Sequence, residues 1–139
     1  MDVRPLTDGL HVSPQIAVAD LKVLAASGYR AVISNRPDGE EPGQPSAAEI
    51  GDAAREAGLE FRHLPVTVPT MTEADAAAFG VALAELPGPV LGFCRSGTRT
   101  TMLWALSQAG VRPTDEIVAA AAAAGYDLEA LRPRLDHPG

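Results

Sequence analysis

Short apolar runs of β type alternate with helical segments along the whole chain, and this alternation restricts the possible folds. Four runs predict strands, at residues 9–14, 29–35, 59–66 and 88–93. Five longer segments predict helices, at residues 17–27, 47–57, 73–86, 100–109 and 114–124, with a further short helix near 128–135. Strands joined through helices form right-handed crossovers. The sequence therefore predicts an α/β fold of three layers, with a mostly parallel central sheet of 4–5 strands between two layers of helices.

Capping patterns mark the ends of several of these helices. Ser46 followed by Glu49 is a capping-box pattern at the start of one helix. Thr72 and Thr114 stand where two later helices are expected to begin, and a threonine hydroxyl there can bond a free backbone amide. Glycines follow the expected C-termini of three helices, at Gly28, Gly58 and Gly110.

The composition excludes several classes of protein. The 139 residues predict one domain over residues 1–139, with one cysteine and a formal net charge of −7. One cysteine excludes an internal disulfide and a multi-cysteine zinc site, and His11 and His137 have no metal-ligand spacing with it. The negative charge and the 4% aromatic content argue against nucleic-acid binding. No segment has the pattern of a signal peptide or a membrane span, so we expect a cytoplasmic protein without membrane contact, cofactor or metal.

The single cysteine, Cys94, lies where an apolar strand meets the start of a helix, in the segment "GFCRSGTRT". A helix N-terminus carries roughly half a positive charge, and its free amides form a nest for an anion. Arg99 adds a full charge and can hold two oxygens of an oxyanion with its planar fork. Such surroundings lower the pKa of a thiol to roughly 3.5–7.5. Although a lone cysteine is most often a core residue, this pattern predicts Cys94 and Arg99 as the catalytic residues.

Three loops are expected to meet at the carboxyl edge of the sheet, where parallel α/β proteins bind their ligands. They contain residues 35–38, 65–70 and 94–99. The candidate substrate-binding residues come from two of these loops and the helix after them, namely Arg36, Asp38, Arg95, Ser96, Gly97, Thr98 and Thr100. Their expected ligand is a small anionic substrate, either thiosulfate, a persulfide or a phosphate ester.

Several residues of this region also have structural interpretations. Arg36 and Asp38 can rim the pocket or pair with each other, and Arg95 can orient the substrate or remain solvated. His63 alternates with apolar neighbours along its strand, which favours a structural role. Trp104 lies on the helix after the Cys94 loop and is expected to pack in the core.

The segment "FCRSGTRT" resembles two known loops: the active loop of rhodanese-type sulfurtransferases and the C-x5-R loop of cysteine-dependent phosphatases. The segments "HVSPQ", "AVISNRPDGEEPGQPS", "EAGLEFRHLPV", "GPVLGFCRSGTRTTMLWAL" and "AAAAGYDLEALRPRL" together resemble the phosphatase-like domain of the beta-lactamase-hydrolase-like protein family. This resemblance implies the fold of the tyrosine and dual-specificity phosphatases. In bacteria such domains occur alone or fused to a persulfide-oxidising metallo-hydrolase domain. The resemblance thus also implies a link to sulfide metabolism and such a hydrolase as a partner.

The chain departs from the phosphatase pattern at three places. Only four residues separate Cys94 from Arg99, which is the rhodanese spacing, and Thr100 stands where the phosphatase arginine would fall. Phe93 replaces the histidine that usually precedes the phosphatase cysteine. The stretch 63–72, which matches the loop of the phosphatase acid, contains no carboxylate. Without an acid, attack on an alkyl phosphate loses roughly 10²–10⁴-fold in rate.

These departures lead us to expect a cysteine-dependent sulfurtransferase, which carries sulfur on Cys94 as a persulfide to a small thiophilic acceptor. A phosphatase that forms a cysteinyl phosphate is the first alternative, and a non-catalytic anion-binding module is the second. The chain lacks the "GHI"-type segment of rhodanese-fold proteins, so the rhodanese likeness is confined to the loop. Asp38, Glu73 and Asp75 remain substitutes for the missing acid, although Glu73 and Asp75 fit better as first-turn helix residues.

Overall fold

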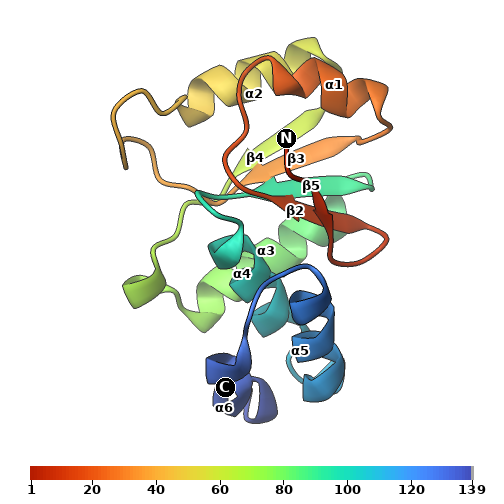
Figure 1. Ribbon diagram of the computed structural model, residues 1–139, viewed down its shortest axis with the longest axis vertical. Coiled ribbons are helices and arrows are strands. Elements are labelled where there is room, and N and C mark those ends of the chain that lie inside the picture. The colour runs from red at the N-terminus through yellow and green to blue at the C-terminus, as the bar shows by residue number, and fades with distance from the viewer. Residues whose placement is uncertain (139) are drawn as a thin grey trace.

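The computed structural model describes residues 1–138, and in this part of the chain five strands form one sheet in the order β1-β2-β5-β3-β4 (Figure 1). The strands are β1 (Arg4–Pro5), β2 (Leu10–Ser13), β3 (Ala31–Ser34), β4 (Glu60–His63) and β5 (Val90–Phe93). Every neighbouring pair is parallel except β1 with β2, which is antiparallel. The mostly parallel sheet is confirmed. The two-residue strand β1 is an addition, because so short a segment carries no periodic signal.

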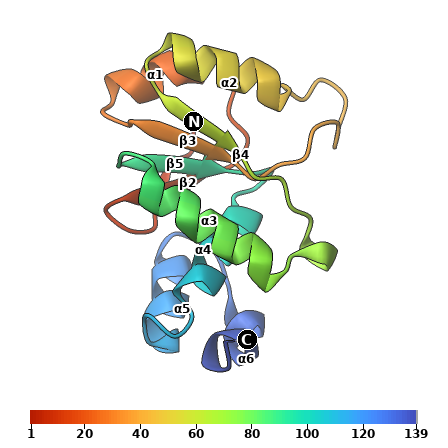
Figure 2. The ribbon, with the colours of Figure 1, turned by 180° about the vertical axis from the view of Figure 1, so that it is seen from behind.

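Helices cover both faces of the sheet (Figures 1 and 2). The α-helices are α1 (Asp20–Ala26), α2 (Ala47–Glu56), α3 (Glu73–Glu85), α4 (Thr98–Gln108), α5 (Thr114–Ala123) and α6 (Arg132–Asp136), with short 3-10 helices η1 (Val68–Thr70) and η2 (Glu129–Leu131). Helices α1 and α2 lie on one face, and α3 and α4 lie on the other, with α5 and α6 packed against α4. No helix of residues 1–138 combines the length and the apolar character that a bilayer crossing requires. The predicted three-layer architecture is confirmed.

The core consists of two apolar clusters separated by the sheet. Leu91 of β5 packs in the cluster under α1 and α2, while its strand neighbour Val90 packs in the cluster under α3 and α4. Successive side chains of a strand point to opposite faces, so a central strand between two helical layers must be apolar on both. Trp104 of α4 is 2% exposed within the second cluster, as expected from its position in the sequence.

The helix caps agree with the sequence at two starts and differ at a third. Ser46 with Glu49 forms a capping box at α2, and Thr72 with Asp75 forms one at α3. The prediction that Thr114 caps α5 is wrong. Pro113 is the N-cap residue, and no side chain caps this helix. Because Pro113 takes the N-cap position, Thr114 is already the first residue of the helix. A residue within the helix no longer has the extended backbone that a capping side chain requires.

Candidate active site

The Cys94 loop connects the end of β5 to the start of α4. Residues 94–97 form a tight turn in which the Gly97 amide donates to the Cys94 sulfur over 3.1 Å. Gly97 has a φ of 93°, in the left-handed region, and a Cβ there would overlap the hydroxyl of Tyr126. Only glycine fits this backbone without strain and leaves room for the tyrosine. The loop therefore brings a donated amide hydrogen to the sulfur, and Cys94 itself is fully buried.

Two contacts from outside the loop hold its backbone in place. The Tyr126 hydroxyl donates to the carbonyl of Ser96 over 2.9 Å, and the backbone amide of Gln15 donates to the carbonyl of Arg95 over 3.2 Å. Burial raises the pKa of Tyr126, so its hydroxyl keeps the proton that it donates. Tyr126 lies after α5 and Gln15 lies after β2, so the loop is held by segments remote in the sequence.

Arg99, in the first turn of α4, is held by a carboxylate that the sequence pattern did not single out. Its Nη1 donates to Oε2 of Glu40 over 2.8 Å and its Nη2 donates to Oε1 over 2.7 Å, in a bidentate pair. Nη1 also donates to the carbonyl of Val66 over 3.0 Å. The hydrogen bonds with Glu40, and after them the nearby Cys94 sulfur, raise the pKa of Arg99. The guanidinium is therefore charged and fixed beside the Cys94 loop.

Arg36 holds Glu40 from the other side. The Arg36 side chain is 1% exposed, and its Nε donates to Oε1 of Glu40 over 2.9 Å. Its remaining nitrogens donate to Oε1 of Gln15 at 3.1 Å and to Oε1 of Glu41 at 3.1 Å. Hydrogen bonds from Arg99, and secondarily from Arg36, lower the pKa of Glu40 to about 2. Glu40 is thus a permanent anion between two guanidinium groups.

The three loops do meet at the carboxyl edge of the sheet. The buried Thr100 donates through Oγ1 to Oδ1 of Asn35 over 2.8 Å, and Nδ2 of Asn35 donates to the carbonyl of Leu64 over 3.0 Å. These bonds join the segments after β3, β4 and β5, and the bond from Arg99 to Val66 joins the last two again. Thr100 is therefore directed at Asn35.

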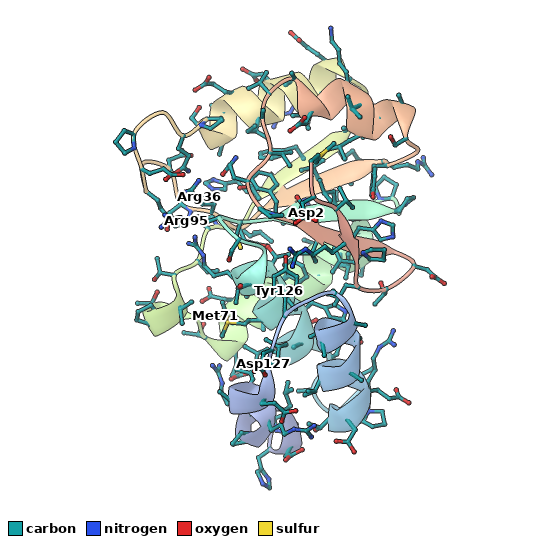
Figure 3. The ribbon with its side chains drawn as sticks, in the orientation of Figure 1. Asp2, Arg36, Met71, Arg95, Tyr126 and Asp127 are labelled. Atoms are coloured by element: carbon teal, nitrogen blue, oxygen red, sulfur yellow. The ribbon has the colours of Figure 1, made fainter. Side chains whose placement is uncertain are left out.

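The other candidate residues differ in how they relate to this loop. Arg95 is 67% exposed and lies beside Arg36 (Figure 3). Both arginines pair with the carboxylate of Glu41. Ser96 donates through Oγ to Oγ1 of Thr98 over 3.0 Å, at the start of α4. Asp38 turns to α2, where its Oδ1 accepts from the Ala47 amide over 2.8 Å.

The carboxylates considered as substitute acids have structural partners. Glu73 pairs with Arg134, and Asp75 completes the capping box of Thr72. His63, through Nε2, bonds the backbone carbonyl of Arg36 at 2.8 Å, which is the structural role its strand position favours.

The residues that sequence reasoning missed are Glu40, Gln15 and Tyr126. Glu40 lies four residues after Arg36, a spacing that indicates an ion pair in a helix. This segment is a glycine-containing loop, so the spacing did not predict the pair. Gln15 and Tyr126 lie in segments that carry the family resemblance, but nothing local in those segments indicates a contact with the Cys94 loop. Among residues 1–138, no group of three or more His, Cys, Asp and Glu side chains could hold a metal ion. An apolar hollow of about 200 Å³ adjoins the loop at Thr98 and is lined by Met102, Leu128 and Leu131.

A buried cysteine in a strand-to-helix turn, with an arginine fixed beside it at the carboxyl edge of a parallel sheet, defines the class of cysteine-dependent phosphatase-like domains. The profile of the family described as "Beta-lactamase hydrolase-like protein, phosphatase-like domain" matches residues 2–111. The chain belongs to this family.

Curated relatives agree with that assignment. A beta-lactamase hydrolase-like protein of Agrobacterium fabrum is 42% identical over 104 residues, which are 75% of this chain and 24% of that protein. One of Xylella fastidiosa is 42% identical over 130 residues, which are 92% of this chain and 30% of that protein. The chain thus spans about a quarter to a third of the length of these relatives.

Solved structures agree on the fold. A candidate phosphatase of Neisseria meningitidis superposes with a TM-score of 0.88 at 40% identity, over 98% of this chain and 97% of that one. The catalytic domain of the PP-IP phosphatase SIW14 of S. cerevisiae, in complex with citrate, has a TM-score of 0.69 at 14% identity, over 99% of this chain and 85% of that one. The names of these relatives fit the phosphatase alternative better than sulfur transfer, which the sequence pattern placed first.

Proposed function

We propose that this chain is a cysteine-dependent phosphatase, which forms a covalent intermediate on Cys94 with a small anionic substrate. The observation that carries the proposal is the joint placement of the two residues: the sulfur accepts the Gly97 amide hydrogen, and the fixed Arg99 guanidinium stands beside the same turn. Oriented amides and a guanidinium stabilise the charge that builds up on a transferring oxyanion. A cysteine-to-serine variant of TpbA from P. aeruginosa, a protein of similar fold, was solved with phosphotyrosine and SIW14 was solved with citrate, which supports an anionic ligand here.

The reaction proceeds in two displacements. The Cys94 thiolate attacks phosphorus, the S–P bond forms, and the ester P–O bond breaks with its electron pair leaving on the ester oxygen. Water then attacks phosphorus and loses a proton to solvent, the S–P bond breaks, and the thiolate is regenerated as inorganic phosphate departs. Arg99 and the loop amides hold the non-bridging oxygens through both steps.

The leaving group must be one that departs without help from an enzymic acid. Glu40 is the carboxylate beside Arg99, and a pKa of about 2 keeps it ionised at neutral pH. Asp38, Glu73 and Asp75 are engaged at helix starts or in an ion pair. We therefore expect activity on aryl phosphates, whose phenolate leaves readily, and roughly 10²–10⁴-fold less on alkyl phosphates.

Sulfur transfer is the second candidate, and the four-residue spacing between Cys94 and Arg99 together with the missing acid favours it. The Cys94 thiolate would attack the outer sulfur of thiosulfate, the new S–S bond would form, and sulfite would leave with the electron pair of the old one. A thiol, sulfite or cyanide would then remove the outer sulfur and restore the thiolate. A sulfite-like leaving group needs no protonation. In this case a persulfide-oxidising metallo-hydrolase is the partner we would expect.

One experiment separates the candidates. The purified protein is incubated with thiosulfate or glutathione persulfide and weighed intact by mass spectrometry, beside an assay of aryl phosphate release. Phosphate release that disappears in Cys94→Ala and falls at least tenfold in Arg99→Lys, without a sulfur adduct, supports the phosphatase. A mass gain of one sulfur that is lost in Cys94→Ala, with negligible phosphate release, overturns it in favour of sulfur transfer. Neither signal, with anion binding retained, would leave a binding module.

A further inference from the structure

Glu40 occupies one edge of the Arg99 guanidinium and leaves another edge open. The Glu40 carboxylate accepts hydrogen bonds from the edge formed by Nη1 and Nη2. The second hydrogen of Nη1 is donated to the Val66 carbonyl. Within residues 1–138 no oxygen acceptor bonds Nε of Arg99 or the second hydrogen of Nη2. The edge formed by Nε and Nη2 is therefore available to an oxyanion in the Cys94 loop without displacement of Glu40.

Glu40 is held in this position by a second arginine, Arg36. Arg36, which is 1% exposed, donates through Nε to the same Oε1 that accepts from Arg99. Arg36 is itself fixed by Gln15 and Glu41, so Glu40 does not swing out as a lone surface glutamate would. Any anion on Arg99 consequently lies close to a second, permanent negative charge.

We propose that Glu40 makes the Cys94 site selective for singly charged anions over doubly charged ones. The charges of Arg99, Arg36 and the exposed Arg95 are matched by those of Glu40, Glu41 and the attacking Cys94 thiolate, so no unmatched cation of the cluster remains. Each further negative charge on a ligand is repelled by Glu40 without a matching cation. The inference rests on the proposed anion site and names its substrate class: the singly protonated form of a phosphate ester or, for sulfur, an organic persulfide in preference to thiosulfate.

This selectivity also accounts for a site that lacks an acid. The monoanion of a phosphate ester carries a proton on one non-bridging oxygen. As the Cys94 sulfur attacks phosphorus and the ester P–O bond breaks, that proton passes to the ester oxygen and the leaving group departs as a neutral alcohol. The substrate's own proton thus assists the leaving group without a carboxylic acid from the loop at 63–72. It replaces a positioned acid only in part, so aryl phosphates remain better substrates than alkyl phosphates.

Two tetrahedral probes of similar shape and different charge test the inference. Sulfate and methyl sulfate are titrated for protection of Cys94 against iodoacetamide, which is neutral, and the ratio of the two dissociation constants is measured. In wild type we expect methyl sulfate to bind at least as tightly as sulfate. In Glu40→Gln the ratio should move about tenfold toward sulfate, because one nearby charge is removed.

Glu41→Gln is the matched control. It makes the same change of charge and loses a contact with the same Arg36, but Glu41 does not touch Arg99. Its ratio should stay within about threefold of wild type. An unchanged ratio in Glu40→Gln, or an equal shift in both variants, overturns the inference. Because the readout is binding, a shift confined to Glu40→Gln supports it even if neither aryl phosphate nor persulfide is turned over, whereas failure of both anions to protect Cys94 in every variant refutes the anion site as well.

Discussion

Gly97 shows how one residue shapes the candidate site. Its φ of 93° places its amide toward the Cys94 sulfur, and the absence of a side chain leaves room for the Tyr126 hydroxyl. A glycine in this position thus serves the backbone conformation and the packing of a remote tyrosine at once. Alanine substitutions at Gly97 and at Gly28, a second glycine with positive φ, separate the cost of the backbone conformation from the cost of the contact with Tyr126.

We predict that Gly97→Ala destabilises the protein by about 3 kcal/mol or more, because left-handed strain of about 1–2 kcal/mol adds to an overlap with Tyr126. Gly28→Ala is the control: its φ is 100°, but a Cβ there meets nothing within 4 Å, so only the strain should appear. Urea unfolding of both variants measures the difference. Equal losses would show that Tyr126 moves aside without cost.

Glu40 should make stability depend on pH in acid. Its pKa is about 2 in the folded chain against an ordinary 4.5, so its ion pairs stabilise the fold fully above pH 4.5. That contribution, on the order of 1 kcal/mol after solvent screening for a side chain that is 24% exposed, is lost as pH falls from about 4.5 to about 2. Urea unfolding at pH 6, 3.5 and 2.5 should show a smaller acid loss for Glu40→Gln than for wild type. Parallel curves for the two proteins would contradict this.

At the scale of elements, helix starts differ in how they are stabilised. Helix α2 begins with the reciprocal bonds of Ser46 and Glu49, whereas α5 begins after Pro113 with no side-chain cap. A hydroxyl residue next to a helix start therefore does not prove a cap. Its side chain can accept from a free amide of the first turn only if the residue itself occupies the N-cap position.

We predict that Ser46→Ala lowers the free energy of unfolding by about 1 kcal/mol, since the Glu49 amide loses its acceptor. Thr114→Ala should cost less than about 0.5 kcal/mol, as expected for a substitution that removes no cap. Chemical denaturation of the two variants checks the contrast. A loss at Thr114 as large as at Ser46 would restore Thr114 as a cap.

At the scale of the whole molecule, one buried hydrogen-bond chain joins the segments that form the site. It runs from Thr100 through Asn35 to the Leu64 carbonyl, and thereby links the start of α4 with the segments that leave β3 and β4. Because Thr100 and Asn35 are both buried, a bond lost between them leaves a polar atom without water.

Thr100→Val should therefore destabilise by about 1–3 kcal/mol, as Oδ1 of Asn35 loses its donor. Thr101→Val is a matched control one residue on, also fully buried. Its Oγ1 bonds the Gly97 carbonyl, which keeps the Thr101 amide as a second donor. We expect this control to cost below about 1 kcal/mol in thermal or urea unfolding. Equal costs would mean that the chain of bonds to Asn35 adds nothing.

Much of this architecture was predictable from the sequence. The strands β2 to β5, the capping box of Ser46 and Glu49, the cap at Thr72 and the turn of Cys94 depend on local patterns of apolar, capping and glycine residues. The meeting of the loops at the carboxyl edge was expected from chain order alone, since crossovers in a parallel sheet have one hand. Asp38 shows the limit: its place near Arg36 in the chain suggested the pocket, but its carboxylate accepts from the Ala47 amide at the start of α2.

By itself, the sequence determined the layered α/β fold and the placement of Cys94 and Arg99 where β5 passes into α4, because strand, glycine and helix patterns are carried by near neighbours in the chain. Only the tertiary structure decided which carboxylate faces Arg99. Glu40 is 59 residues away in sequence, and the bond forms because the segment after β3 and the start of α4 meet at one edge of the sheet with the buried Arg36 behind them. Long-range pairing of charges depends on how elements pack, and no local pattern carries that information.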